Sequence, residues 1–285
     1  MRAIDVRHLG NEQVICCWEV DGLLIDPGPE STLATLLEEL GDERPRALLL
    51  THIHFDHAGA TGALLRHWPD LPVYVHERGA PHLVDPSRLV ASAGRLYGGE
   101  EGLRRLWGEV VPVPEANLRV LRGGERDVEG AFRVEYTPGH ASHHVCFLHE
   151  PSGWAFVGDT AGVRVPSHPC TVAPTPPPDI DVEAWDASIE RVKAWEPVGL
   201  GLTHFGPAED AIEQLDRCRE ALHAQAELVA RYDRDRFVAE LEARVRAEVG
   251  AEAPALLQAA PPDQVFMGLD RWRRKRAEAQ AATEE

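Results

Sequence analysis

The chain has 285 residues and a mass of 31.4 kDa, with 44% hydrophobic and 27% charged residues, a balance typical of one large globular domain or a domain with an appendage. A formal net charge of −18 repels phosphate backbones and anionic membrane surfaces, so neither nucleic acid nor membrane is expected as a main partner. The five cysteines include no CxxC pair, which argues against a disulfide framework or a structural zinc knuckle.

The first ten residues contain no apolar segment of the kind that export signals carry, and no stretch is long and apolar enough to span a bilayer. The cytoplasm is therefore the expected compartment. The one cluster of cations, residues 271–276, lies among strong helix formers. We interpret it as the solvated face of a helix rather than as a binding patch.

The first part of the chain alternates short apolar runs with segments of helical spacing. Predicted strands cover 3–9, 13–20, 22–28, 46–51 and 71–77, with turns at 10–11 and 21–22. Predicted helices cover 31–40, with Ser31 or Thr32 near its cap, and 58–68. Residues 77–110 are expected to form a mostly helical insert, interrupted by glycines.

The second part returns to strands and then becomes helical. Predicted strands cover 132–137, 144–150, 154–159 and 198–204, and a helix is expected near 183–195. Residues 163–181 hold many prolines and no periodicity, which predicts an ordered loop. From 207 onward Ala, Glu and Arg recur with helical spacing. The order of elements predicts an α/β architecture with helices outside two sheets and a helical C-terminal region.

Four of the apolar runs end in side chains that can bind a metal ion. Ligands at the carboxyl ends of strands gather at one edge of an α/β sheet, which is where binding sites form. Each residue alone has a structural explanation: Asp56 as a helix N-cap, Asp159 as a turn cap, a single histidine as a surface group. Four strand ends that all terminate in such groups favour a metal site. The candidate ligands are His52, His54, Asp56, His57, His140, Asp159 and His204.

The spacing of the first four candidates has a geometric explanation. Alternate residues of an extended segment point to one side, so His52, His54 and Asp56 are expected to face a common site. His57 becomes available as the chain turns into a helix, and Gly59 and Gly62 would let that helix lie close to the cluster. Imidazole and carboxylate donors without thiolate favour zinc first, with iron or manganese as alternatives.

At these residues the chain resembles the metallo-β-lactamase fold superfamily. "HIHFDH" at 52–57 is similar to its His-x-His-x-Asp-His motif, and three further motifs follow in the expected order: "TPGH" at 137–140, "GDT" at 158–160 and "THFG" at 203–206. The resemblance implies a four-layer αβ/βα sandwich over residues 1–206, followed by a C-terminal helical region at 207–285. It also implies a site for two divalent metal ions.

Carried over by motif, the resemblance implies that His52, His54 and His140 hold one metal ion. Asp56, His57 and His204 would hold the other, and Asp159 would bridge them. Asp56 would have a second, catalytic role, because its carboxylate would orient the nucleophile.

The motifs most resemble the hydroxyacylglutathione hydrolase branch, without the glutathione-binding pattern that a true member would show. This implies a hydrolase that uses a hydroxide of the dinuclear site to cleave a small thioester, ester or lactone. Three alternatives stay open: a phosphodiesterase or nuclease of the same superfamily, a mononuclear iron persulfide dioxygenase, and a non-catalytic metal-binding protein. The expected partner is a small molecule, and a homodimer is left open.

Further histidines and the insert supply additional candidates. His143 and His144 begin a predicted strand, where neighbouring side chains point to opposite faces. At most one of them is therefore expected to face the site, with His144 favoured. His76 is interpreted as a turn residue and His168 as a candidate substrate contact. Specificity is expected to depend on the insert and on the proline-rich loop at 163–181. The candidate contacts in the insert are Arg95, Tyr97, Arg104 and Trp107, and packing of its short helices is the competing explanation.

Overall fold

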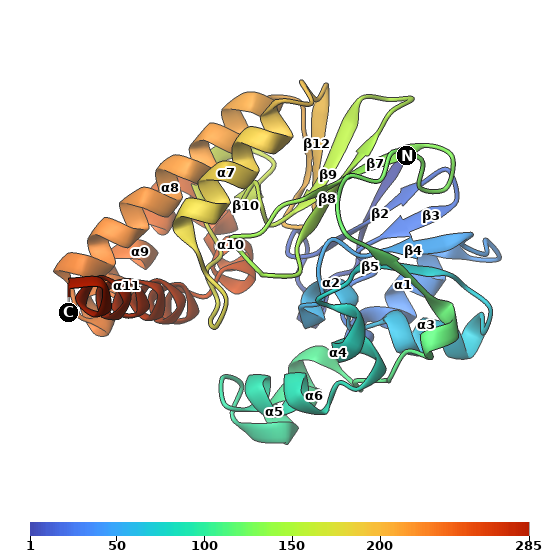
Figure 1. Ribbon diagram of the computed structural model, residues 1–285, viewed down its shortest axis with the longest axis horizontal. Helices are drawn as coiled ribbons and strands as arrows, with labels where there is room; N and C mark the ends of the chain where they lie inside the picture. The colour runs from blue at the N-terminus through green and yellow to red at the C-terminus, as the bar shows by residue number, and fades with distance from the viewer. Residues whose placement is uncertain (285) are drawn as a thin grey trace.

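Two mixed β-sheets face each other and carry helices on their outer sides (Figure 1). The computed structural model describes residues 1–284 and confirms the predicted αβ/βα sandwich. The first sheet has the order β1-β2-β3-β4-β5-β6, with strands Arg2–Asp5, Cys16–Val20, Leu23–Ile25, Ala47–Leu49, Val73–His76 and Leu118–Leu121. The second has the order β13-β12-β9-β8-β7, with strands Gly206–Ala208, Gly199–Leu202, Trp154–Gly158, Val145–His149 and Phe132–Tyr136.

The helices fall into three groups along the chain. Beside the first sheet lie α1 (Leu33–Leu40), α2 (Phe55–Ala58) and α3 (Thr61–His67). The insert contains α4 (Ala80–Val84), α5 (Ser87–Gly94) and α6 (Gly99–Trp107). The remainder are α7 (Val182–Lys193), α8 (Ala211–Arg231), α9 (Arg234–Val249), α10 (Ala253–Ala259) and α11 (Pro262–Glu284). Short 3₁₀ turns occur at η1 (His8–Gly10), η2 (Glu30–Thr32), η3 (Glu115–Asn117) and η4 (Gly250–Glu252).

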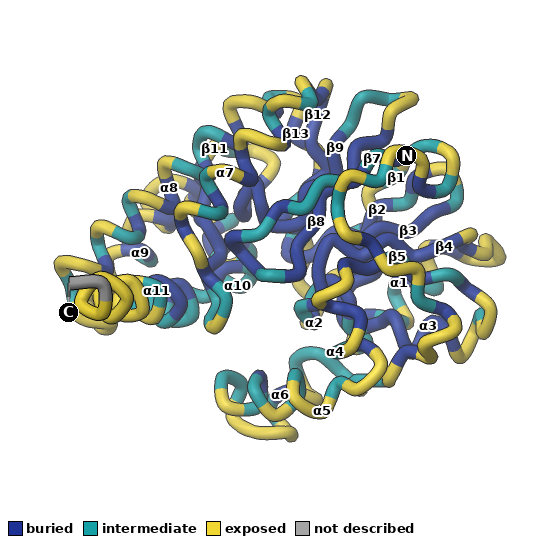
Figure 2. Tube along the Cα trace, viewed as in Figure 1, coloured by how far each residue is buried: buried dark blue, intermediate teal, exposed yellow. Residues whose placement is uncertain are grey.

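The space between the sheets is filled by side chains from both inner faces. Trp18 and Ile25 of the first sheet belong to the same buried cluster as Phe132, Phe147 and Phe156 of the second. The rings of Trp18 and Phe156 meet edge to face at 5.4 Å, an arrangement that aromatic pairs prefer. The inner strands of both sheets are accordingly buried, whereas the outer faces of the helices are exposed (Figure 2). This packing between the sheets fixes the position of one sheet relative to the other.

The predicted turn at 21–22 joins β2 to β3. Asp21 has φ 51° and Gly22 has φ 79°, the left-handed conformation that a two-residue hairpin turn requires at both positions. β2 and β3 pair antiparallel through this turn, and β3 then pairs parallel with β4. β4 in this way lies beside β3, and the carboxyl ends of both strands meet at one edge of the sheet.

Two sequence predictions were wrong. The stretch 163–181 is not entirely a loop, because β10 (Val163–Val165) and β11 (His168–Val172) form an antiparallel hairpin. Its apolar side chains join the core of the second sheet, and this burial outweighs the proline content. The predicted strand 3–9 ends at Asp5, since Arg7 and Leu9 take positive φ and a 3₁₀ turn follows.

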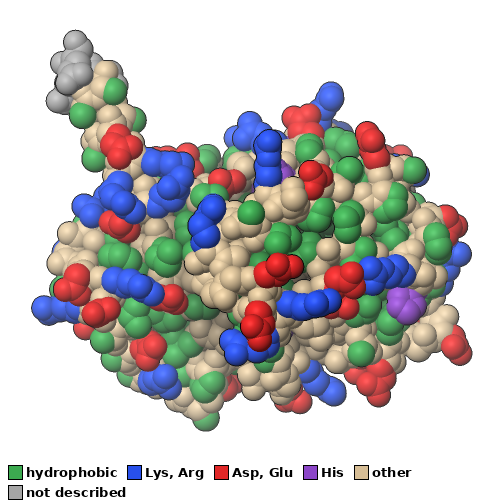
Figure 3. Space-filling view, turned by 90° about the horizontal axis from the view of Figure 1, so that it is seen from below, with side chains coloured by type: hydrophobic (Ala, Val, Ile, Leu, Met, Phe, Trp, Pro, Cys, Tyr) green, Lys and Arg blue, Asp and Glu red, His purple; other side chains and the backbone are tan. Residues whose placement is uncertain are grey.

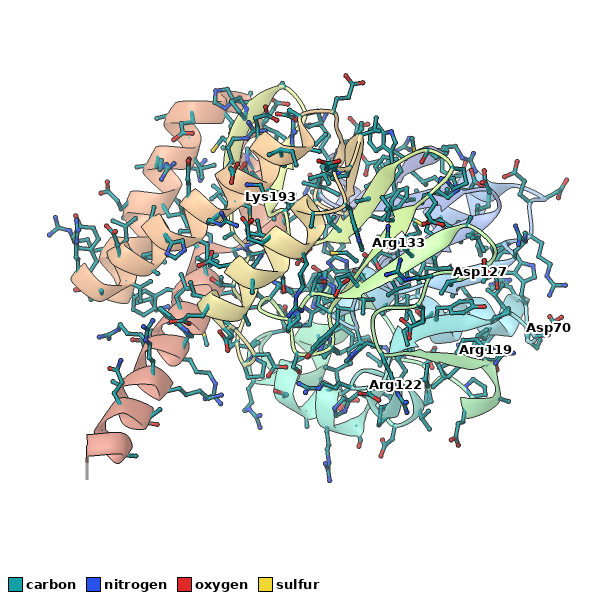
Figure 4. All side chains as sticks on the ribbon, turned by 45° about the horizontal axis from the view of Figure 1, so that its top comes forward. Asp70, Arg119, Arg122, Asp127, Arg133 and Lys193 are labelled. Atoms are coloured by element: carbon teal, nitrogen blue, oxygen red, sulfur yellow. The ribbon has the colours of Figure 1, made fainter. Side chains whose placement is uncertain are left out.

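The C-terminal helices cover the outer face of the second sheet. Residues from β9, β12 and α7 through α11 belong to one buried cluster, and Lys193 on α7 pairs with Asp216 on α8 at 2.5 Å (Figure 4). The end of α11 projects from the body of the molecule (Figure 3). The proposed boundary at residue 206 stays a prediction. Within residues 1–284, no helix combines the length and apolarity that a membrane crossing demands.

β6 is an edge strand of the first sheet, and charged side chains surround it. Arg119 within β6 and Arg122 and Asp127 after it are exposed on the outside of the molecule (Figure 4). Charges on an edge strand oppose its pairing with another chain. We therefore interpret these charges as a protection of the edge strand against pairing with another chain, and not as part of the site.

Gly59 and Gly62 pack against chain segments rather than against the metal-ligand candidates, contrary to the sequence-based expectation. A Cβ on Gly59 would crowd the backbone of Pro29 and Glu30, and one on Gly62 would overlap the carbonyl oxygen of Val111. Gly62 therefore lets the chain that leaves the insert lie directly on α3.

We expect Gly62→Ala to lower the free energy of unfolding by about 1–3 kcal/mol, because the added methyl group overpacks this contact. Gly94→Ala is the matched control, since its Cβ would meet no atom closer than 3.8 Å. That control should leave stability unchanged or raise it by up to about 1 kcal/mol. Chemical denaturation measures both variants, and equal effects would contradict the assigned contact.

Candidate metal centre

The seven candidate ligands lie together between the two sheets at the carboxyl ends of four strands. β4 leads to His52, His54 and α2, β7 to the loop that holds His140, β9 to Asp159, and β12 to His204. Three overlapping groups have ligand atoms within 4.8 Å of one another: His52, His54 and His140; His52, His57 and Asp159; Asp56, His57 and His204.

Three imidazole nitrogens meet on one side of this cluster. Nδ1 of His54 lies 3.0 Å from Nε2 of His52 and 3.0 Å from Nε2 of His140. Burial lowers the pKa of His54 to about 4, and the pKa of His52 also falls well below its usual value because of burial and neighbouring His57. These rings are consequently neutral at pH 7 and offer lone pairs to a cation.

The other side of the cluster pairs imidazoles with carboxylates. Nε2 of His204 lies 3.4 Å from Oδ2 of Asp56, and Nε2 of His57 lies 3.2 Å from Oδ1 of Asp159. Burial would lower the pKa of His57, but the carboxylates of Asp159, Asp26 and Asp56 raise it well above its usual value. Oδ2 of Asp159 is also 3.2 Å from Nε2 of His140, so this carboxylate touches both sides.

Asp56 is positioned by a helix and not by the strand alternation that the sequence suggested. His52 and His54 lie in extended chain after β4, but Asp56 and His57 already belong to α2. Alternation along a strand therefore accounts for the two histidines only. The first turn of α2 aims Asp56 at His204 and His57 at Asp159.

Hydrogen bonds to backbone carbonyl groups orient two of the imidazole rings on the side that faces away from the cluster. His140 Nδ1 donates to the carbonyl of Pro174 at 2.9 Å, and His204 Nδ1 donates to the carbonyl of Val14 at 2.7 Å. In the neutral form of each ring the proton is therefore on Nδ1, and Nε2 offers its lone pair to the cluster, as is usual for metal-binding histidines. Sequence reasoning did not find these backbone partners, because they depend on tertiary contacts.

Asp26 is a functional residue that sequence reasoning missed. Its side chain is fully buried and accepts hydrogen bonds from Thr51 N (2.8 Å), Thr51 Oγ1 (2.6 Å), His57 Nδ1 (2.8 Å) and Thr203 Oγ1 (2.9 Å). The signal was present, because Asp26 also ends an apolar run, but Asp26 was included in the predicted strand 22–28 and was not considered as a site residue.

His143 and His144 both lie against the ring of His52, so the expectation that at most one faces the site was wrong. The ring centroids are 6.1 Å and 4.8 Å from that of His52. Strand alternation fails here because β8 begins only at Val145. His143 Nδ1 accepts from the backbone N–H of Ile53, and His144 Nε2 accepts from that of Asp159, both at 3.4 Å. The two rings therefore hold the backbone of two segments that carry candidate ligands, at Ile53 and at Asp159.

Two other histidines do not reach the cluster. His76 stacks on Tyr136 at 4.5 Å, and its Nδ1 accepts from Arg78 N. His168 Nδ1 accepts from Cys170 N at 3.0 Å within the β10–β11 hairpin. Neither residue lines the pocket above the candidate ligands. His76 is therefore the predicted turn residue, and the expected substrate contact of His168 has no structural support.

A pocket of about 300 Å³ opens over the cluster. His54, Asp56, His140, Asp159 and His204 contribute to its floor. Of the insert candidates, Tyr97 and Trp107 line it, whereas Arg95 and Arg104 do not. The opposite wall comes from α10 and α11, with Gln258, Pro261, Gln264 and Val265 among its residues, a contribution that sequence reasoning did not anticipate.

The residues present fit a bound cation. Three of the converging atoms within residues 1–284 are buried and make no hydrogen bond of good geometry: His57 Nε2, Asp159 Oδ1 and His204 Nε2. The two nitrogens lie 3.2 Å and 3.7 Å from the oxygen as ion-pair contacts only. Buried polar atoms without partners are rare and costly in folded proteins. A metal ion would satisfy all three atoms, and nitrogen and oxygen donors of this kind suit zinc, iron or manganese.

The chain is similar to solved structures and to curated proteins. The archaeal metallo-beta-lactamase superfamily protein ST1585 of Sulfolobus tokodaii superposes with a TM-score of 0.72 at 22% identity, over 96% of this chain and 98% of that one. TTHA1623, solved in a di-iron-bound form, has a TM-score of 0.51 at 28% identity, over 70% of this chain and 91% of that one.

A hydroxyacylglutathione hydrolase of Salmonella paratyphi A is 31% identical over 144 residues, which cover 48% of this chain and 41% of that protein. The chain thus matches less than half the length of this relative. The profile of the metallo-beta-lactamase superfamily matches residues 19–220, well over half of the chain. That match contains the whole histidine and aspartate cluster, and the chain belongs to the metallo-beta-lactamase superfamily.

Proposed function

We propose that this protein is a metal-dependent hydrolase that cleaves a small thioester, ester or lactone with the help of two divalent metal ions. The observation that carries the proposal is the convergence of seven nitrogen and oxygen donors, five of which line the floor of a pocket. Three of the converging atoms are buried and make no hydrogen bond of good geometry. The superfamily and the similarity to a hydroxyacylglutathione hydrolase support the same reaction class.

The ligand assignment follows the two sides of the cluster. His52, His54 and His140 would hold one ion, and Asp56, His57 and His204 the other, with Asp159 between them because its two oxygens face His57 and His140. Zinc is the first choice for these donors, and iron is the alternative that a di-iron-bound relative supports. When bound, such ions polarise a carbonyl and lower the pKa of water to about 7.

Side chains of the protein would orient the water molecule and the metal ligands. Asp159 is buried, whereas the side chain of Asp56 is 23% exposed toward the pocket. Asp56 is therefore the carboxylate that can accept a hydrogen bond from a water molecule at the pocket floor and orient it. The rings of His140 and His204 stay fixed through their backbone hydrogen bonds, so the donors need no rearrangement during the reaction.

A small carbonyl compound is proposed as substrate rather than nucleic acid. The net charge is −18, and cations and anions are interspersed on the face seen in Figure 3. Binding to nucleic acid depends on clustered cations that replace counterions, and this arrangement does not supply them. The cytoplasm remains the proposed compartment.

Metal-loaded enzyme should hydrolyse members of a thioester, ester and lactone panel. Asp56→Asn should reduce turnover at least about a hundredfold, since misplacing a reacting group can cost about 10² in rate. Asp127→Asn, an exposed change outside the pocket lining, is the matched control and should keep full activity. Phosphodiester cleavage that exceeds every carbonyl substrate and is lost in Asp56→Asn would replace the proposed reaction class with that of a phosphodiesterase.

Asp26→Asn should weaken zinc affinity about 10–100-fold, the usual effect of removing a group that orients a metal ligand. The amide presents N–H groups to the donors of His57 and the two threonines, so at least one bond of the present set is lost. Competition with a chromogenic chelator measures the affinity, with Asp127→Asn again as control. Unchanged affinity in folded Asp26→Asn would refute the orienting role.

A further inference from the structure

The walls of the pocket over the metal-ligand candidates are mainly apolar. Among the lining residues within 1–284 there is no lysine and no arginine. The insert contributes Leu89, Ala93, Leu96 and Trp107, and the C-terminal helices contribute Ala259, Ala260, Pro261 and Val265. The ionisable side chains of the lining, apart from those of the floor, are His8 and Tyr97. The walls therefore offer apolar contact and no cation for an anionic group.

Both walls are joined to each other, which encloses the pocket. Tyr97 of the insert lies with its hydroxyl 3.5 Å from Oε1 of Gln264 on α11. Gln258 of α10 donates to Nδ1 and the carbonyl of His8, and Nε2 of His8 donates to the carbonyl of Leu106 in α6. His8 also stacks on Trp107 at 4.8 Å, with the rings nearly parallel. The apolar side chains of the two walls are thus held at a fixed separation.

We propose that the pocket binds the acyl chain of a neutral aliphatic thioester or ester of medium length and disfavours anionic conjugates such as those of glutathione. This rests on the proposed hydrolase function and names its substrate class. In the reaction the carbonyl C–S or C–O bond breaks, a C–O bond to the water oxygen forms, and the thiol or alcohol leaves with the second proton of water. Burial of each methylene group favours binding by a factor of about three to four.

Two guanidinium groups lie near the rim without lining the pocket. Arg95 contacts Oγ of Ser92 at 3.5 Å, and Arg271 donates to the carbonyl of Pro178 at 3.3 Å. Both are exposed, so their attraction for an anion is screened by salt. The overall charge of −18 acts in the opposite direction. An anionic leaving group consequently finds no lysine or arginine side chain in the pocket walls that residues 1–284 form.

The direct test compares two thioethers that cannot be hydrolysed, S-hexyl-N-acetylcysteamine and S-hexylglutathione. Isothermal calorimetry with the zinc-loaded protein at 0.15 M salt should show at least tenfold tighter binding of the neutral compound. A neutral series from ethyl to hexyl should gain affinity roughly threefold per methylene. Equal or tighter binding of S-hexylglutathione would overturn the proposal.

A variant pair locates the effect in the pocket wall. Leu96→Arg places a cation in the lining and should reduce the preference for the neutral thioether at least fivefold. Val84→Arg introduces the same change on α4, where Val84 is 37% exposed and outside the lining, and should leave the preference intact. Thermal melting checks that both variants fold. If both variants change the preference equally, the wall is not its source and the proposal fails.

Turnover separates this inference from the function on which it rests. The matched thioesters S-hexanoyl-N-acetylcysteamine and S-hexanoylglutathione should differ in kcat/KM in the same direction as the thioethers differ in affinity. Absence of turnover on every thioester, ester and lactone would refute the hydrolase function, while the thioether affinities still decide what the pocket binds. Turnover with a preference for the glutathione thioester would refute the substrate class and leave the hydrolase function standing.

Discussion

The carboxylate of Asp26 is the point at which the two sheets and the candidate metal centre are joined. It lies at the end of β3 and is fully buried. It accepts hydrogen bonds from Thr51 after β4, His57 on α2 and Thr203 after β12 of the opposite sheet. Two backbone bonds reinforce the junction, from Val145 N to the carbonyl of Thr51 and from Cys16 N to that of Thr203, both 2.8 Å. A buried carboxylate requires such partners, so the strand ends that supply them are held in one arrangement.

The rest of the site depends on that arrangement. Once the strand ends are fixed, His57 faces Asp159 and His204 faces Asp56 without further adjustment. The floor of the pocket is in this way built by the sandwich itself. Its walls come largely from the insert, the segment 174–178 and helices α10 and α11. Under the proposed function, the floor would supply the reaction chemistry, and wall residues such as Leu96 and Val265 would select the acyl group.

The sequence predicts the sandwich and the cluster because both are encoded in short segments. Residues 52–57 carry four candidate ligands, and His140, Asp159 and His204 each follow an apolar run, so strand ends could be recognised one at a time. The β10–β11 hairpin was missed because its prolines obscured the alternation of Val163 and Val165. Asp26 was missed because its partners come from three separate elements. Tyr97 and Trp107 of the insert wall were anticipated, whereas the wall from α10 and α11 was missed because contacts such as that of His8 with Gln258 join residues 250 positions apart.

The central claim is that the donors oriented by this junction hold two metal ions side by side. Titration of metal-free protein with zinc, followed by elemental analysis after removal of loosely bound metal, tests it most directly. The account predicts close to two zinc ions per chain in the native protein, and about one in His204→Ala, because that change removes a donor from only one of the two sets. A stoichiometry of one or less in the native protein, even with excess zinc, would contradict the account.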